Sequence, residues 1–568
     1  MTSVPTINGD LSKNLEPLIA VLTDDTAQAA NIRERLLAAT ARFVAQGGAP
    51  ASASMTERTA YLITYGDSIR RPDQAPLATL RHTLDATVGP LISDVHLLPI
   101  FPWTSDDGFA VTDYHQVDPA LGDWDDVTAL AQNRGIALDF VANHMSSEAG
   151  WFRGWLERDP EYADFFVTPA DDFDTSQVVR PRTSPLTHRY ERPDGSIVRA
   201  WSTFGRDQVD VNAANPATLE ALTDVLLAYV AQGATTIRLD AIGYLWKESG
   251  TSCIHLPGTH AIVKIWRAIL DHVAPGVKLL TETNVPHPDN ISYFGDLTDE
   301  AHMVYQFALP PLVLHSFLSG SASRLSEWSR HLEDLGEHAT WFNFLASHDG
   351  VGMRPSRGIL TAEEQEALAD RAHSSGGRAS YAAEPDGSQS VYELNVNYLD
   401  ALVDDNERQD DAVVASRARA AHAILLAQIG VPAIYVHSLF GSRADIAGMV
   451  ESGVNRRINR EKLDADALVS GLEHDARRRG VFEALSHMLT VRRRHAAFAP
   501  TSPQEVLDWG SQVYAIRRGS GAEAVTVVVN VSRTPARIEG RDRIDVLTGD
   551  SVGSIDLQPD GVVWLKEG

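Results

Sequence analysis

The chain has 568 residues, 43% hydrophobic and 22% charged, which is long enough for a large catalytic domain with further parts. Its formal net charge of −27 argues against a nucleic-acid partner or an anionic membrane, because both require a basic protein face. No stretch approaches the roughly 18 apolar residues of a membrane helix, the N-terminus lacks the features of a secretory signal, and Cys253 is the single cysteine. We therefore expect a cytoplasmic protein without an intramolecular disulfide.

The chain begins with a helical pattern. Apolar residues recur at helix-like intervals through residues 1–55, and this pattern ends in the linker-like sequence GGAPASASM. We expect a helical N-terminal extension over 1–55.

Short apolar runs then alternate with longer amphipathic segments. Eight runs have the composition of buried strands: 60–65, 94–100, 136–142, 235–241, 277–283, 302–309, 340–346 and 432–438. Continuous apolar strands belong in a sheet that is covered on both faces. Their alternation with helical segments predicts an α/β fold, a (β/α)8 or TIM barrel over 56–490.

Two gaps between the predicted strands are too long for a single helix. Residues 146–215 hold many Asp, Pro, Arg and aromatic residues with little periodicity, which predicts an inserted subdomain after the third strand. Residues 355–420 contain the polar stretch HSSGGRASYAAEPDGSQS and predict a second insertion. From about residue 495 the pattern changes to short strands and turns, which predicts a C-terminal all-β domain over 495–568.

Polar residues gather at the carboxyl ends of the predicted strands, where barrel enzymes build their sites. Asp240, Glu282 and Asp349 end the fourth, fifth and seventh strands. Other polar residues at these ends are Asp67, Asp113, Tyr114, Asp139, Asn143, His144, Arg238 and His348. The opposite ends show nothing comparable. This repetition favours a reactive site over a structural ion pair between Arg238 and Asp240.

The carboxylates indicate glycosyl transfer. One carboxylate can attack the anomeric carbon and form a covalent glycosyl intermediate, while a second acts first as acid and then as base. An arginine beside the nucleophile would keep it ionised, whereas the acid needs a less charge-compensated setting. His144 and His348 have no second His or Cys at a familiar metal spacing. We expect neither a metal nor a cofactor.

Four segments carry a family resemblance: DFVANH (139–144), IRLDAIGY (237–244), TETN (281–284) and FLASHD (344–349). In this order and spacing they resemble the four signature regions of glycoside hydrolase family 13, the α-amylase family. The resemblance implies that Asp240 is the nucleophile, Glu282 the acid/base, and Asp349 a third carboxylate that grips sugar hydroxyls. It further implies roles in holding the glucosyl unit for Arg238, His144, His348, Asp67 and Tyr114. Many amylases have a calcium site that Asn143 could join, but the nearest branch of the family does not imply one.

Within the family, the chain is similar to the sucrose phosphorylase branch. The segments that carry this similarity are ITYGDSI, GTSC, YELNVNYLDAL and INR. The segments YLWKESGTSCIHLP and YVHSLFGSR resemble the corresponding sequences of the glucosylglycerate phosphorylases more than those of the sucrose enzymes. Tyr114 and Asn284 stand where the sucrose enzymes tend to have His, which argues against sucrose as the preferred donor. Trp246 is a weaker candidate for stacking on sugar.

A phosphorylase must direct phosphate, rather than water, to the glucosyl-enzyme, and phosphate favours arginine forks. The stretch SGVNRRINREK concentrates arginines in an otherwise acidic chain. We predict Arg460 first, and Arg456 with it, as phosphate ligands. Tyr244 matches a tyrosine that the resemblance places near phosphate and substrate. Arg443 is predicted to pair with the carboxylate of a glycerate aglycone.

These observations predict a retaining phosphorylase that converts an α-glucoside and inorganic phosphate into α-glucose 1-phosphate, as a monomer or homodimer. The expected aglycone is D-glycerate; glucosylglycerol, sucrose and sucrose 6-phosphate are alternative donors. An α-glucosidase or transglucosidase is a second class of enzyme. A non-enzymatic sugar-binding protein is a third reading, disfavoured because binding alone would not need all three carboxylates.

Overall fold

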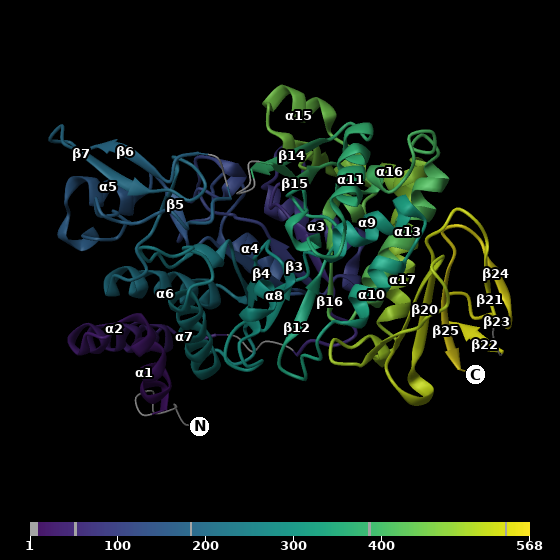
Figure 1. Cartoon of the computed structure of the whole chain (residues 1–568), viewed down its shortest axis with the longest axis horizontal. Helices are drawn as coiled ribbons and strands as arrows, with labels where there is room; N and C mark the ends of the chain where they lie inside the picture. The colour runs from purple at the N-terminus through teal and green to yellow at the C-terminus, as the bar shows by residue number, and fades with distance from the viewer. Residues whose placement is uncertain (1–9, 50–53, 182–183, 384–387, 540–541, 568) are drawn as a thin grey trace. The chain divides into compact units, whose positions relative to one another are not determined.

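The computed structural model describes residues 10–49, 54–181, 184–383, 388–539 and 542–567 (Figure 1). Packing divides the chain into two compact units. The first comprises Met1–Ser54, His96–Thr283 and Asp289–Val304, and the second comprises Met55–Val95, Asn284–Pro288 and Tyr305–Gly568.

Eight strands form a closed barrel in the order β1, β16, β12, β11, β10, β9, β4, β3. They are β1 (Tyr61–Thr64), β3 (Asp94–Leu97), β4 (Gly135–Phe140), β9 (Ala234–Leu239), β10 (Lys278–Thr281), β11 (Met303–Tyr305), β12 (Thr340–Asn343) and β16 (Val431–Tyr435). β9 pairs in parallel with β4 and β10, and β16 pairs in parallel with β1 and β12. Each predicted apolar run overlaps one barrel strand, and the predicted TIM barrel is confirmed.

In the first unit, two long helices precede the strands that carry the first two predicted carboxylates. Helix α6 (Pro216–Ala231) leads into β9, and α7 (Pro257–Val273) leads into β10. The N-terminal helices α1 (Asp10–Leu22) and α2 (Thr26–Ala45) pack on α7 and α6 respectively. Further helices of this unit are α4 (Trp124–Ala131), α5 (Gly150–Glu157) and, at its end, part of α8 (His287–Ile291).

The segment after β4 is built from small antiparallel pairs. β5 (His144–Ser146) pairs with β8 (Gln208–Asp210), and β6 (Thr187–Glu191) pairs with β7 (Ile197–Trp201). Asp207 fixes this segment by accepting hydrogen bonds from the hydroxyls of Thr104 and Ser105 (both 2.5 Å) and of Ser147 (2.8 Å). Burial acts to raise the pKa of Asp207, but these hydroxyl donors outweigh burial and the pKa is lowered.

In the second unit, two strands of a three-stranded antiparallel sheet lie within the predicted second insertion, and the third, β13 (Val351–Gly352), lies just before it. The strands of this sheet are β13, β15 (Gln389–Asn395) and β14 (Arg378–Ala383), in that order. The other helices and short strands of this unit are β2 (Ile69–Arg70), α3 (Pro76–Thr87), α9 (Leu309–Ser319), α10 (Ser323–Arg330), α11 (Ala362–Ser374), α12 (Tyr398–Ala401), α13 (Asp411–Ala427), α14 (Val436–Leu439), α15 (Ile446–Ser452), β17 (Leu463–Asp464), α16 (Ala465–His474) and α17 (Ala476–Arg492).

The C-terminal part is all-β. A six-stranded sheet has the order β18 (Gln504–Val506), β19 (Val513–Arg518), β20 (Val525–Asn530), β25 (Val562–Glu567), β22 (Arg543–Asp545), β23 (Ser551–Val552). A second, two-stranded sheet pairs β21 (Ala536–Ile538) with β24 (Ile555–Leu557). The two sheets bury a shared apolar core that includes Ala515, Val528, Leu557 and Leu565. The predicted all-β character of this region is confirmed.

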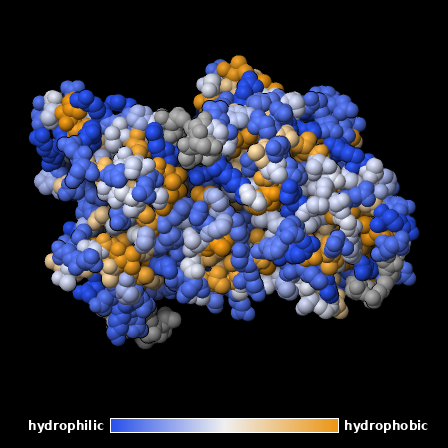
Figure 2. Space-filling view, viewed as in Figure 1, coloured by the Kyte–Doolittle hydropathy of each residue, from blue (hydrophilic) through white to orange (hydrophobic). Residues whose placement is uncertain are grey.

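The visible face in Figure 2 is largely hydrophilic, with scattered apolar groups. One apolar group lies over α15, where Ile446 and Val450 are exposed. Within the described ranges, no helix has the length and apolar character needed to cross a membrane.

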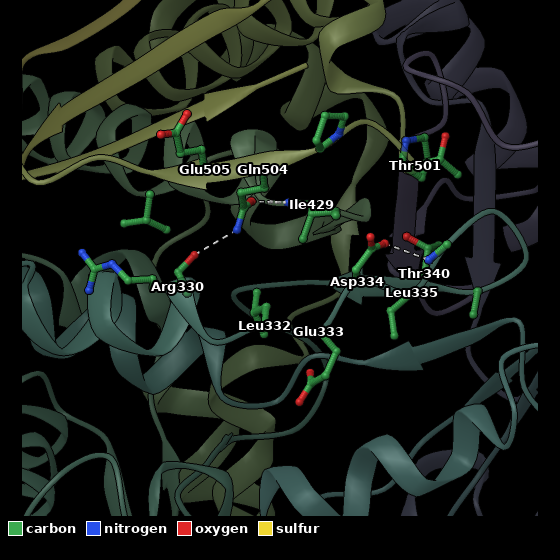
Figure 3. Close-up of a pocket in the computed structure, with 16 residues that line it drawn as sticks. Arg330, Leu332, Glu333, Asp334, Leu335, Thr340, Ile429, Thr501, Gln504 and Glu505 are labelled. Atoms are coloured by element: carbon green, nitrogen blue, oxygen red, sulfur yellow. Dashed lines mark hydrogen bonds between the residues drawn. The ribbon is translucent and has the colours of Figure 1, made fainter. Parts of the chain in front are cut away.

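A cavity of about 550 Å³ lies at the amino ends of two barrel strands (Figure 3). Thr340, which begins β12, and Ile429, two residues before β16, both line it. The Gln504 side chain lines the cavity. It accepts a hydrogen bond from the Ile429 amide (2.7 Å) and donates one to Ser329 Oγ (3.1 Å). The cavity is therefore at the opposite end of β12 from Asp349.

Candidate active site

Neighbouring strands bring Asp240 and Glu282 together. β9 and β10 run in parallel register, and each carboxylate follows its strand directly. The Glu282 amide donates a hydrogen bond to Leu239 O (3.1 Å), and the Ala241 amide donates one to Glu282 Oε2 (2.9 Å). The Glu282 carboxylate thus lies against the backbone that carries Asp240.

Arg238 links these carboxylates to a buried charge network. Its Nη1 lies 2.8 Å from Asp240 Oδ1 and also bonds Asp139, while Nη2 lies 3.9 Å from Glu282 Oε2. Asp139 receives a second bond from His96 Nε2 at 2.8 Å. Burial acts to raise the pKa of Asp139, but Arg238 and His96 outweigh burial and the pKa is lowered. Arg238, 2% exposed, is thereby held by two carboxylates and compensates the charge of Asp240.

The turn after Asp240 has a strained backbone. Ala241 has φ +45°, a left-handed conformation that costs roughly 1–2 kcal/mol for a residue with a Cβ. Gly243 follows two residues later, and a Cβ there would lie 3.1 Å from Tyr293 Oη and 3.2 Å from His255 Cε1. This tight turn directs Tyr244 toward the Phe204 ring, with ring centroids 5.4 Å apart.

His144 and Tyr114 lie in the same unit as Asp240. His144 Nε2 is 2.9 Å from Phe109 O, and the His144 ring contacts Phe204 at 5.2 Å. Burial lowers the pKa of His144. The Tyr114 hydroxyl is buried and donates to Val141 O at 2.7 Å, so Tyr114 braces the backbone that leads into His144. Phe109 and Phe204 are additions that the sequence did not signal; Arg238 also lies over the Phe109 ring at 5.7 Å.

Lys247 is a further residue that the sequence did not signal. Its Nζ lies 2.7 Å from Asp210 Oδ2 and 3.2 Å from Asn143 Oδ1, and it bonds Tyr244 O. The side chain is 4% exposed. Asn143, the residue that could join a calcium site in many amylases, therefore bonds an ammonium group of the chain itself. Across the residues that the structure describes, no group of three or more His, Cys, Asp and Glu side chains could hold a metal ion.

Asp349, in the second unit, is surrounded by basic side chains. Its Oδ1 lies 2.7 Å from Arg456 Nη1 and 3.5 Å from Arg460 Nη2, and its Oδ2 lies 3.5 Å from His348 Nε2. Arg460 also donates from Nε to His348 O at 2.9 Å. The Arg460 side chain is 1% exposed and that of Arg456 is 19% exposed. The two predicted phosphate ligands therefore both contact the third carboxylate.

Asp67 lies in the same unit and has two cationic partners. Lys462 and Arg70 both bond its carboxylate. Burial acts to raise the pKa of Asp67, but Lys462 and Arg70 outweigh burial and the pKa is lowered. Lys462 also lies over the Tyr65 ring at 4.7 Å. Lys462 lies two residues after Arg460, so a basic stretch of sequence does mark it.

Two predicted residues have other neighbours. Arg443, whose side chain is 49% exposed, pairs with Asp475 at 2.8 Å and Asp411 at 3.0 Å. Trp246 packs tightly on Gly258, where a Cβ would lie 2.3 Å from the indole, so its ring serves packing.

Comparisons with known proteins identify the family of the chain. Residues 91–357 match the family model of the α-amylase catalytic domain. The glucosylglycerate phosphorylase of Spirochaeta thermophila is 48% identical over 476 residues, covering 83% of this chain and 80% of the relative. The glucosylglycerate phosphorylase of Escherichia coli K12 is 43% identical over 518 residues, covering 90% and 92%.

A solved structure gives the same fold. The crystal structure of sucrose 6F-phosphate phosphorylase from Thermoanaerobacter thermosaccharolyticum has a TM-score of 0.75 at 24% identity, over 89% of this chain and 99% of that one. Sequence identity above 40% over most of the chain is the stronger finding. The chain belongs to the α-amylase family, glycoside hydrolase family 13, and within it to the group of the glucosylglycerate phosphorylases.

Proposed function

We propose that this protein is a retaining α-glucoside phosphorylase that reversibly converts 2-O-α-glucosylglycerate and phosphate into α-glucose 1-phosphate and D-glycerate. The observation that carries the proposal is the pairing of Asp240 with Arg238, beside the Glu282 carboxylate. A charge-compensated carboxylate next to a second carboxyl group is the arrangement that double displacement needs. The relatives named above support the choice of phosphate as acceptor and of glycerate as aglycone.

In the first step, Asp240 attacks the anomeric carbon and a C–O bond to the carboxylate forms. The glycosidic C–O bond breaks, and Glu282 gives its proton to the departing glycerate oxygen. Arg238 keeps Asp240 ionised as the nucleophile, and its more distant contact with Glu282 leaves that group free to carry a proton. We propose that Asp67, Tyr114, His144, His348 and Asp349 hold the glucosyl unit.

In the second step, a phosphate oxygen attacks the anomeric carbon and the bond to Asp240 breaks. Glu282, now a carboxylate, accepts the phosphate proton, and the two inversions together retain the α-configuration. We assign the phosphate to Arg456, Arg460 and Tyr244. Of the two arginines, we place the first contact on Arg456, because it keeps more of its side chain in contact with solvent.

The glycerate carboxylate needs a cation of its own. We propose Arg443 for this role, with a change of partners from Asp475 and Asp411 when the aglycone binds. We further propose that the enzyme acts in the cytoplasm, where phosphate and sugar phosphates are used, as a monomer or homodimer.

The test compares donors and acceptors in one assay. The protein is incubated with 2-O-α-glucosylglycerate, glucosylglycerol, sucrose or sucrose 6-phosphate, with and without phosphate, and glucose 1-phosphate is measured against free glucose. We expect phosphate-dependent glucose 1-phosphate formation, fastest from glucosylglycerate. Mainly phosphate-independent glucose release would instead identify an α-glucosidase, and preference for another donor would change the aglycone.

A further inference from the structure

Glu393 in β15 is a buried carboxylate that the proposed chemistry does not use. Its side chain is 7% exposed. Oε1 accepts hydrogen bonds from Arg456 Nη2 at 2.8 Å and from the Gly350 amide at 3.3 Å. Oε2 accepts from Asn395 Nδ2 at 3.3 Å. Both oxygens are therefore fixed before any substrate binds.

These contacts close a ring that includes the third carboxylate. Arg456 reaches Glu393 with Nη2 and Asp349 with Nη1, at 2.8 and 2.7 Å. Gly350, which donates its amide to Glu393, is the residue after Asp349. One guanidinium is thus held by two carboxylates, and the backbone ties those carboxylates together.

The local backbone is built for this approach. β13 and β15 are antiparallel, with Gly352 opposite Glu393 and Val351 opposite Leu394. A Cβ at position 350 would lie 2.6 Å from both Glu393 Cγ and Leu394 O. Only glycine allows the chain after Asp349 to pass so close to β15.

Arg456 needs such an anchor more than Arg460 does. Arg460 is fixed by its burial, by His348 O and by Asp349. Arg456 instead lies in the short 3-10 helix Asn455–Asn459, and its side chain is 19% exposed. A free arginine side chain has about 2 kcal/mol of rotamer entropy to lose when it binds an anion. A partner on a paired β-strand removes that cost in advance.

We propose that Glu393 is a positioning residue for transfer to phosphate: it holds the Arg456 guanidinium against Asp349 and so sets the affinity for inorganic phosphate. The inference rests on the proposed function, in which Arg456 contacts phosphate. It assigns to the β13–β15–β14 sheet the task of presenting this carboxylate. The length of the Glu393 side chain matters more than its charge, because a shorter carboxylate side chain cannot span the distance to Arg456 and fix its guanidinium.

The test measures how the glucosyl-enzyme partitions between phosphate and water. α-Glucosyl fluoride serves as donor, because it forms the glucosyl-enzyme without the aglycone subsite. Glucose 1-phosphate and free glucose are measured in the same reaction over a range of phosphate concentrations. Glu393→Asp keeps the charge and shortens the reach, whereas Glu393→Gln keeps the reach and removes the charge. Glu366→Gln, in the same insertion and bonded to Tyr381, is the matched control.

We expect Glu393→Asp to raise the phosphate concentration for half-transfer about tenfold, Glu393→Gln to raise it threefold or less, and the control to leave it unchanged. A purely structural role would lower both products together and leave their ratio unchanged, which overturns the inference. The reverse order, with Gln worse than Asp, would mean that Glu393 acts only as a counter-charge and also overturns it. A wild-type enzyme that makes only glucose at every phosphate concentration would refute the proposed function itself, which is a separate result.

Discussion

At the scale of single residues, Arg238 and Asp240 form a buried ion pair whose carboxylate is also the nucleophile of the proposed mechanism. Moving an arginine out of water costs several kcal/mol unless carboxylates compensate it. Arg238 has two, and Asp139 is the fully buried one. In the proposed mechanism, Asp139 and His96 fix the far side of the network, so Arg238 stays in place while Asp240 engages the substrate.

Lys247 gives a prediction about the loop after Asp240. Replacing it by methionine removes the cation that Asp210, 0% exposed, pairs with at 2.7 Å. A buried carboxylate left without its partner costs about 3–5 kcal/mol. We expect Lys247→Met to lower the thermal midpoint by several degrees and to lower activity, because Asn143 and Tyr244 lose the same contact. Differential scanning calorimetry and the phosphorolysis assay measure the two effects.

Lys264→Met is the control for this change. Lys264 pairs with Asp299 at 2.6 Å, but both side chains are partly exposed. Such a pair contributes about 1 kcal/mol or less. Equal losses in the two variants would contradict the role assigned to Lys247.

His422 in α13 gives a prediction about pH. It is 1% exposed, its Nδ1 lies 2.8 Å from Ala418 O, and burial lowers its pKa to about 4. The unfolded chain takes up this proton near pH 6.5 but the folded protein does not, so stability falls as pH falls from about 6.5 to 4. Between pH 7 and pH 5 this amounts to about 2 kcal/mol.

We therefore expect His422→Gln to lose about 2 kcal/mol less stability than the wild type between pH 7 and pH 5. Urea unfolding at the two pH values measures the difference. His331→Gln changes a side chain that is 69% exposed and should follow the wild type. If both variants show the wild-type pH dependence of the free energy of unfolding, the role assigned to His422 is contradicted.

At the scale of elements, the buried Arg518 explains how the end of α13 and the C-terminal sheet are joined within the second unit. Arg518 of β19 donates to four carbonyls, those of Ala427 and Gln428 (both 2.8 Å) and those of Ala499 and Ser502 (2.9 and 3.1 Å). Its side chain is 0% exposed. The carbonyls at a helix C-terminus have no partners within the helix and favour a cation.

We expect Arg518→Met to destabilise the protein by about 3 kcal/mol or more, since several buried carbonyls lose their donors at once. Arg517→Met is the neighbouring control, because Arg517 is 39% exposed and lies 3.8 Å from Glu505. Thermal unfolding of both variants measures the contrast. A similar midpoint for the two would show that the carbonyl contacts contribute little.

The elements also show why the sequence predicts some features and not others. The barrel strands are readable because both faces are buried, so each strand is a continuous apolar run. The run 302–309 is longer than β11 because α9 follows it after three residues, and both elements are apolar. Asp240 and Glu282 were predictable from their strand ends. Lys247 and Glu393 were not, because their partners Asp210 and Arg456 lie 37 and 63 residues away and pairing at that distance follows no local spacing.

For the whole molecule, the negative net charge contrasts with a local cluster of basic residues. A net charge of −27 repels anionic co-substrates from the surface as a whole. Arg456, Arg460 and Lys462 are gathered in seven residues, and each contacts a carboxylate. Local cations that are already paired and oriented can bind an anion without a basic surface, since the field within a few ångströms outweighs a screened distant one.

The N-terminal helices provide the last prediction. Helices α1 and α2 bury Leu15 and Phe43, among other apolar side chains, on the faces of α7 and α6. Deleting residues 1–54, so that the chain starts at Met55, would expose those faces to water. Because α6 and α7 lead into β9 and β10, we expect lower solubility, a lower thermal midpoint and a lower kcat. The double variant Arg35→Ala, Arg42→Ala removes only the half-exposed ion pairs with Glu220 and Asp224 and should cost about 1 kcal/mol or less. A truncated protein with the thermal midpoint and kcat of the full chain would show that the helices are dispensable. A double variant as unstable as the truncated protein would show that the ion pairs, and not the apolar packing, account for the stabilisation.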